Sequence, residues 1–177
     1  VMSSATKKLL TFIIIMLIAI ATIVGCVYVL TELGQSNKSS VSSSITPEIS
    51  AAQVNKEVIE EIGYEDISEL DSGDISGHID VPEDSVTQTS IYIADSSSSA
   101  VELACFKLKN PDDNKAILEA ISKHIALKLK GYSQSPKESE LIRNYVTDTC
   151  NGYVFMVISE SPEAAAMAFR DAVNNKN

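Results

Sequence analysis

The sequence contains one continuous apolar segment long enough to cross a lipid bilayer. Residues 9–30 read LLTFIIIMLIAIATIVGCVYVL and contain no charged side chain. As an α-helix this segment would be about 33 Å long, close to the ~30 Å thickness of the hydrocarbon layer. Lys7 and Lys8 precede it and Glu32 is the first charge after it. The positive-inside tendency therefore predicts that residues 1–8 are cytoplasmic and that residues 31–177 lie outside the cell.

The same segment also fits a bacterial lipoprotein signal peptide. Ile23-Val24-Gly25-Cys26 resembles a lipobox, in which a lipid is attached to the cysteine before the signal is removed. Cys26 is then the lipidation site and the first residue of the mature protein. Val27–Leu30 continue the apolar run beyond this cysteine, which favours an uncleaved transmembrane helix. In both interpretations the following domain is tethered outside, at the cell membrane.

Charge disfavours one class of partner. All 24 Asp and Glu residues and 12 of the 14 Lys and Arg residues follow the apolar segment, so the rest of the chain is strongly acidic. A basic surface for a polyanion is therefore disfavoured, and we expect no nucleic acid partner. The length of 177 residues corresponds to about one folded domain.

The part after the apolar segment divides into a linker and one domain. Residues 31–45 include the Ser-rich stretch QSNKSSVSSS, which is too polar to bury a core and is expected to form a flexible stalk. The domain is expected over residues 46–177. Four helix starts are predicted by proline in a first turn after a capping residue, at Thr46-Pro47-Glu48, Asn110-Pro111-Asp112, Ser135-Pro136 and Ser161-Pro162-Glu163.

Four strands are predicted between these helices, at residues 89–94, 101–109, 144–149 and 153–159. Every position from Tyr153 to Ile158 is apolar, which indicates a central strand covered on both faces. Asn151-Gly152 favours positive φ and predicts a tight hairpin before it. The order ββαββα predicts an α+β fold, a two-layer domain in which a mainly antiparallel sheet of about four strands carries helices on one face.

Several segments carry a family resemblance: residues 79–84 (IDVPED), residues 102–109 (ELACFKLK), Gly131-Tyr132 with Pro136, and Gly152-Tyr153-Val154 leading into Ser159. In these features the stretch from Leu70 to Val173 resembles a family of uncharacterised extracytoplasmic proteins of Gram-positive bacteria, many of them lipoprotein-like, known as domain of unknown function 4358. The resemblance implies a membrane-tethered domain of the cell envelope and supplies no activity. Cys105 within its strand and the Ser-rich connection Ser96–Ser99 depart from the family pattern.

Acidic side chains and histidines are the strongest local signals for a site. Residues 57–84 contain many carboxylates and no Lys or Arg, but Asp71-Ser72-Gly73-Asp74 lacks the spacing of an EF-hand, so a solvated acidic face is favoured over ordered Ca²⁺ binding. His78 lies near Asp74 and Asp80, a grouping suited to proton transfer or metal ligation. His124 lies at the edge of an apolar helix face, where a packing or capping role is favoured. With 2 histidines and no Cys-x-x-Cys or His-Glu-x-x-His motif, zinc has little support.

The remaining chemistry is sparse. An oxidising exterior would permit a disulfide between Cys105 and Cys150. Cys105 is expected in the middle of a strand and Cys150 near the end of a hairpin, and these positions favour two free thiols. No Gly-x-Ser-x-Gly motif or glycine-rich phosphate loop is present. The aromatic residues of the strands are interpreted as core side chains.

These features predict a membrane-tethered extracytoplasmic binding or scaffolding domain of a bacterial envelope, with the bilayer and an unidentified envelope partner or ligand as its partners. We assign no catalytic, cofactor-binding or metal-binding residue and no cofactor; Cys26 is the one candidate modification site. Two alternatives stay open. One is an extracytoplasmic hydrolase or thiol-dependent enzyme, for example with His78 acting beside Asp74 or Asp80, and the other is a calcium-responsive surface module.

Overall fold

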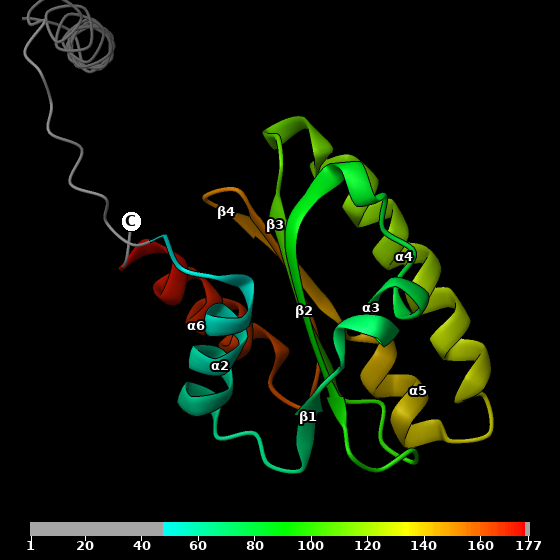
Figure 1. The fold of residues 1–177 in the computed structure, drawn as a ribbon. Helices are drawn as coiled ribbons and strands as arrows, with labels where there is room; N and C mark the ends of the chain where they lie inside the picture. The colour runs from blue at the N-terminus through cyan, green and yellow to red at the C-terminus, as the bar shows by residue number, and fades with distance from the viewer. Residues whose placement is uncertain (1–47, 176–177) are drawn as a thin grey trace, which may run out of the picture. The chain divides into compact units, whose positions relative to one another are not determined.

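A five-stranded antiparallel sheet forms the centre of the structure, a computed structural model that describes residues 48–175 (Figure 1). The strand order is β1-β2-β3-β5-β4, and each neighbouring pair is antiparallel. The strands are β1 (Ile67–Glu69), β2 (Val86–Ala94), β3 (Glu102–Leu108), β4 (Val146–Cys150) and β5 (Tyr153–Ile158). β3 lies in the middle, so its side chains alternate between two covered faces.

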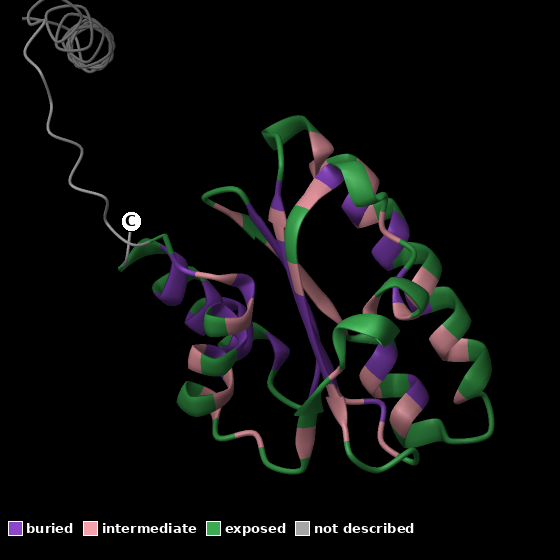
Figure 2. Cartoon of the chain, in the orientation of Figure 1, coloured by how far each residue is buried: buried purple, intermediate pink, exposed green. Residues whose placement is uncertain are grey.

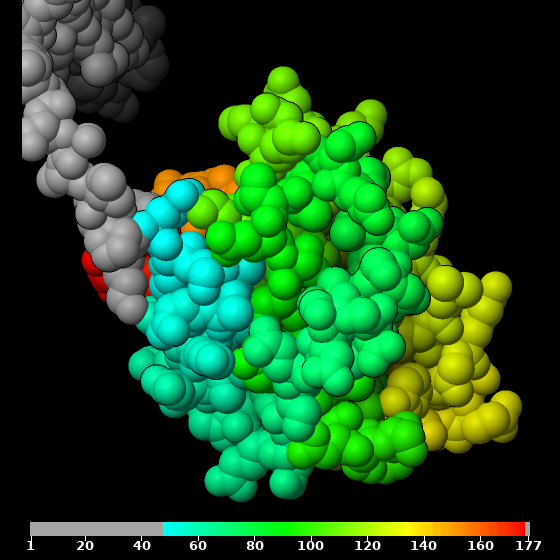
Figure 3. Space-filling view, viewed as in Figure 1, coloured from blue at the N-terminus to red at the C-terminus, as the bar shows by residue number. Residues whose placement is uncertain are grey.

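Helices cover both faces of this sheet, as Figure 1 shows. On one face lie α2 (Ala51–Ile62) and α6 (Pro162–Asn174), and on the other lie α3 (Ser72–His78), α4 (Asn114–Gly131) and α5 (Pro136–Arg143). Two short 3₁₀ turns, η1 (Glu83–Ser85) and η2 (Pro111–Asp113), precede β2 and α4. Each face has its own hydrophobic cluster, and the purple strands at the centre of Figure 2 are buried between them. In the space-filling view, residues from α2 to β3 form most of the visible surface of the domain (Figure 3).

The α+β class and the antiparallel sheet are confirmed, but the prediction of helices on one face is wrong. The sheet is the middle of three layers because β5 is apolar at every position and all six of its residues are buried. Phe155 packs against α6 on one side, while Val154 and Met156 belong to the cluster under α4 and α5. A strand of this kind requires cover on both faces. The two hairpin–helix units, β2-β3-α4 and β4-β5-α6, therefore place their helices on opposite sides.

The local signals at the helix starts give mixed results. Asn110 and Asp113 form a capping box around Pro111, and α4 follows directly as predicted. α5 and α6 both begin at the predicted prolines. The first helix, α2, begins at Ala51 and not at the predicted start near Pro47. Its cap is Ser50, whose side chain accepts a hydrogen bond from the Gln53 backbone N–H at 3.1 Å.

Two elements were not predicted from the sequence: β1 and α3, both inside the acidic stretch of residues 57–84. β1 has three residues and adds the fifth strand at an edge of the sheet. α3 is a seven-residue helix in which no residue is buried. It contains two glycines, which are poor helix formers. The predicted count of about four strands is therefore one short.

The Asn151-Gly152 hairpin is confirmed. Asn151 has a φ of 48° and Gly152 a φ of 81°, and Cys150 pairs with Tyr153 across the turn. A Cβ at Gly152 would have no heavy atom within 4 Å, so the cost of a side chain there comes from the backbone conformation alone.

Gly152→Ala is expected to lower the free energy of unfolding by about 1–2 kcal/mol, because alanine disfavours the left-handed region. Gly131→Ala at the end of α4 is the matched control, since Gly131 has neither a positive φ nor a close neighbour and is expected to leave stability equal or slightly raised. Urea denaturation of the two variants measures the difference. Equal stability of the two would refute the role given to the turn.

The predicted apolar segment at residues 9–30, the linker at residues 31–45 and Cys26 lie outside the described residues. Within residues 48–175, none of the helices combines the length and apolar character needed to cross a bilayer.

Candidate functional site

Glu102 is a carboxylate in a position where a strand would ordinarily carry an apolar residue. It is the first residue of β3, paired with Ile93 on β2 and Ile158 on β5. Its side chain shares the α4 face of the sheet with Ala104, and it is 0% exposed. Burial of a carboxylate is costly unless donors surround it, so its neighbours decide what it does.

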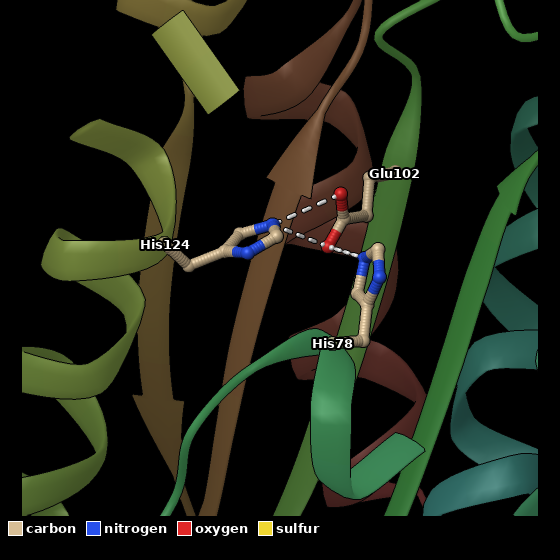
Figure 4. Close-up of side chains that lie close together, drawn as sticks. All are labelled: His78, Glu102 and His124. Carbon is tan, nitrogen blue, oxygen red and sulfur yellow. Dashed lines mark hydrogen bonds and ion pairs between the residues drawn. The ribbon is translucent and has the colours of Figure 1, made fainter. Parts of the chain in front are cut away.

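Three nitrogen-bearing side chains surround this carboxylate. His78 is the last residue of α3, and His124 and Lys128 are one turn apart on α4. Their side chains are 27%, 10% and 12% exposed, respectively. Three elements that are distant in the chain thus bring their polar atoms to one point, as Figure 4 shows for His78, Glu102 and His124.

Both imidazoles direct Nε2 at the same carboxylate oxygen. His78 Nε2 lies 3.1 Å from Glu102 Oε1, and His124 Nε2 lies 2.9 Å from Oε1 and 3.1 Å from Oε2 (Figure 4). The Lys128 ammonium donates to Oε2. The two imidazole ring centroids are 4.9 Å apart. Both histidines therefore contact Oε1, while Oε2 accepts from the Lys128 ammonium and is also contacted by His124.

These contacts keep Glu102 ionised. Burial by itself raises the pKa of a carboxyl group, but hydrogen bonds from His124 and His78 and the charge of Lys128 outweigh burial, and the pKa of Glu102 falls well below its ordinary value of 4.5. The carboxylate is thus available as an anion at every physiological pH.

The cluster lies at the wall of an open pocket of about 400 Å³. The pocket is lined by His78, Ile93, Ala94, Ser96, Ser97, Ser99, Val101, His124, Leu127, Lys128 and Tyr132. The Tyr132 hydroxyl shares its proton between the backbone carbonyls of Ser97 and Ser99, at 3.0 and 2.6 Å, and so ties the β2–β3 connection to the end of α4. A small molecule or ion entering from solvent would meet the two imidazoles at this wall.

His78 departs from the sequence-based interpretation, and His124 agrees with it in part. His78 contacts Glu102 rather than Asp74 or Asp80, both of which are exposed. His124 is packed, as predicted, yet its Nε2 belongs to the same cluster. Within residues 48–175, His78, Glu102 and His124 are the one group of at least three metal-capable side chains, with ligand atoms all within 4.8 Å of one another.

Sequence reasoning missed Glu102 and Lys128. The signal for Glu102 was a charged residue inside the apolar run Val101–Phe106, where the positions after it, Leu103–Phe106, are buried. The signal for Lys128 was its spacing of four from His124, which places both side chains on the same side of a helix. Neither signal indicates the partner on another element.

Cys105 is poorly placed to act as the nucleophile of a thiol-dependent enzyme. Cys105 is fully buried in the cluster under α2 and α6, on the face of β3 opposite to Glu102, and burial strongly raises the pKa of its thiol. Cys105 and Cys150 are both free, which confirms the prediction of two unpaired thiols. The hydrolase alternative named Asp74 or Asp80 beside His78, whereas the carboxylate that His78 contacts in the structure is Glu102.

The acidic side chains of residues 57–84 are distributed over α2, β1, α3, η1 and the connections between them. They therefore favour a solvated face over an ordered Ca²⁺ site. Four of the five aromatic residues interpreted as core side chains are buried, namely Tyr92, Phe106, Tyr153 and Phe155. Tyr145 lies just before β4 and is half-buried.

The fold and the site define a small three-layer α+β domain with a buried carboxylate shared by two histidines and a lysine at the wall of a pocket. A family model, described as a domain of unknown function (DUF4358), matches residues 60–159. The chain belongs to this family, as the resemblance predicted, and the matched region includes α3, β3 and α4 and thus all four residues of the cluster. No curated protein and no solved structure matches the chain.

Proposed function

We propose that this chain is a binding domain tethered to the outer side of a bacterial cell membrane, with its ligand site at the pocket beside Glu102. The observation that carries the binding role is the buried Glu102 carboxylate, on which three nitrogen donors converge at the wall of an open pocket. A pocket of this kind favours ligand binding over a purely scaffolding role.

A cluster of buried charged and polar side chains stabilises a fold less efficiently than apolar side chains do. Replacing a buried set of paired charges by apolar side chains of similar size is often neutral or stabilising. Ile93 and Ile158, the strand neighbours of Glu102, show that apolar side chains fit this end of the sheet. Four polar side chains beside a pocket therefore support a role in binding.

The tether is proposed from the sequence. Residues 9–30 have the length and composition of a transmembrane helix, Lys7 and Lys8 favour a cytoplasmic N-terminus, and the Ser-rich residues 35–44 suit a stalk. Lipidation at Cys26 is the alternative anchor, and both anchors leave the domain at the outer face of the membrane of a Gram-positive cell. The bilayer and an envelope ligand are the partners in this proposal.

Labelling with a membrane-impermeant maleimide tests the orientation. Met167 on α6 is 68% exposed, so Met167→Cys in a Cys150→Ser background provides a reactive thiol, while Cys105 stays shielded at 0% exposure. We expect intact cells to label Met167→Cys as fully as permeabilised cells do, and the Cys150→Ser parent to stay unlabelled. Labelling of Met167→Cys only after permeabilisation would refute the proposed location.

A fatty-acid probe separates the two anchors. Incorporation that is lost in Cys26→Ser, together with altered processing, would establish the lipoprotein. A full-length parent that takes up no probe would establish the transmembrane helix.

A further inference from the structure

We propose that His78, Glu102 and His124 bind a divalent transition-metal ion of the zinc class, through Nε2 of each histidine and Oε1 of the glutamate. The inference rests on the proposed binding role of the pocket and names its ligand. Both histidines of the chain belong to this group, and they come from different helices.

The spacing of the three ligand atoms suits a metal. Tetrahedral zinc has bonds of about 2.0–2.1 Å to nitrogen and oxygen, so two of its ligand atoms lie roughly 3.3 Å apart. The distances from Oε1 to Nε2 of His78 and of His124 are 3.1 and 2.9 Å, and no pair of ligand atoms is more than 4.8 Å apart. Small movements of the two imidazoles away from Oε1 and toward each other would admit the ion.

The element that would move most easily is α3. It is a short helix with no buried residue, and His78 is its last residue, 27% exposed. Glu102 and His124 are held by the centre of the sheet and by an 18-residue helix. The site thus combines two fixed ligands with one adjustable ligand.

The ligand chemistry selects the class of metal. Imidazole nitrogen suits zinc and its first-row neighbours, whereas Ca²⁺ and Mg²⁺ take oxygen ligands almost exclusively. Each imidazole must present an unprotonated Nε2 and carry its proton on Nδ1. The remaining coordination positions would face the pocket and its water.

Lys128 occupies the other carboxylate oxygen and is the main competitor for the charge of Glu102. Its ammonium contacts Oε2, which leaves Oε1 to the two histidines. A metal on Oε1 would repel this ammonium, so Lys128 lowers the affinity without being a ligand. Substitution of Lys128 therefore distinguishes a metal site from a network of hydrogen bonds.

The test uses the full chain in detergent, with Zn²⁺ titrated by calorimetry and Zn²⁺ and Ca²⁺ added in thermal unfolding. We expect one Zn²⁺ per chain, a melting temperature several degrees higher with Zn²⁺, and no rise with Ca²⁺. His78→Ala and His124→Ala should each weaken Zn²⁺ binding at least about tenfold. Asp74→Asn, an exposed acid on α3, should bind as the parent does.

Lys128→Met should bind Zn²⁺ at least as tightly as the parent, and circular dichroism establishes that each variant is folded. Co²⁺ adds a spectroscopic readout, since the parent should give the intense visible bands of tetrahedral nitrogen–oxygen ligation and His78→Ala should not. The inference is overturned if the folded parent binds Zn²⁺ no better than His78→Ala, or if Lys128→Met loses binding to the same extent. Such a result would not affect the location that the maleimide labelling tests. Labelling only after permeabilisation would refute that location without refuting the metal site, so the two proposals can fail separately.

Discussion

Glu102→Gln is expected to lower the free energy of unfolding by about 3 kcal/mol at neutral pH, because it removes the charge that Lys128 and the two histidines surround. Glu102 is 0% exposed, so water cannot replace the lost carboxylate oxygen. Urea denaturation with a chelator present measures this effect without any contribution from metal. An unchanged denaturation midpoint would show that Glu102 is not held as the structure describes.

The same variant gives a pH signature. The folded-state pKa of Glu102 lies below the ordinary value of 4.5, so its stabilisation is complete above about pH 5 and is lost as the pH falls through 4.5 toward the folded-state pKa. The stability difference between the parent and Glu102→Gln should therefore shrink as the pH falls below 4.5. A difference that grew as the pH fell below 4.5 would contradict the direction of the pKa shift.

A double variant separates two contributions to the free energy of unfolding: the penalty of burying an unpaired Lys128, and the net stabilisation by the Glu102–Lys128 pair. Glu102→Leu leaves the ammonium of Lys128, whose side chain is 12% exposed, without its carboxylate partner. Adding Lys128→Met should recover about 2 kcal/mol of the loss, since an apolar pair replaces a buried ionic one at little cost. Full recovery in a chain that no longer binds Zn²⁺ would support a cluster maintained for binding. No recovery would mean that the cluster is required for folding.

Phe155→Ala is expected to cost about 4 kcal/mol, a large share of the 5–15 kcal/mol that stabilises a typical domain. Phe155 is fully buried on β5, and its ring stacks on Phe169 of α6 with centroids 4.9 Å apart and planes within 6°. Truncation would leave a cavity between the sheet and α6 that a rigid strand and helix cannot close. The shift of the urea midpoint at unchanged slope measures the loss.

Met167→Ala is the matched control for Phe155→Ala. Met167 lies on the same helix, α6, but is 68% exposed, so its truncation is expected to change stability by no more than about 0.5 kcal/mol. Comparable losses in the two variants would contradict the assignment of the hydrophobic cluster under α2 and α6, and with it the three-layer architecture.

Much of the fold could be predicted from local patterns. The capping box at Asn110, the prolines that open α5 and α6, and the Asn151-Gly152 turn are short-range signals, and the structure confirms each. Local patterns do not predict which face of the sheet each helix covers. The two hairpin–helix units have similar patterns, yet α4 and α6 lie on opposite faces. The apolar run of β5 did contain the information that both faces are covered.

The candidate site is harder to predict than the fold. His78, Glu102 and His124 come from three elements, and no spacing in the chain links a short helix to a strand and to a helix beyond it. α3 itself was missed since its glycines weaken the helical pattern. His78 was therefore assigned to its nearest acids in sequence, whereas the buried acid that it contacts lies at the start of β3.

X-ray absorption at the zinc edge of the full chain loaded with one equivalent of Zn²⁺ examines the proposed ligand set most directly. The proposal predicts a shell of nitrogen and oxygen atoms at about 2.0–2.1 Å, with the multiple-scattering pattern of two imidazoles that falls to one in His78→Ala. A sulfur shell near 2.3 Å would assign the ion to cysteine. That shell, or one with no imidazole contribution, would contradict a metal centre at His78, Glu102 and His124.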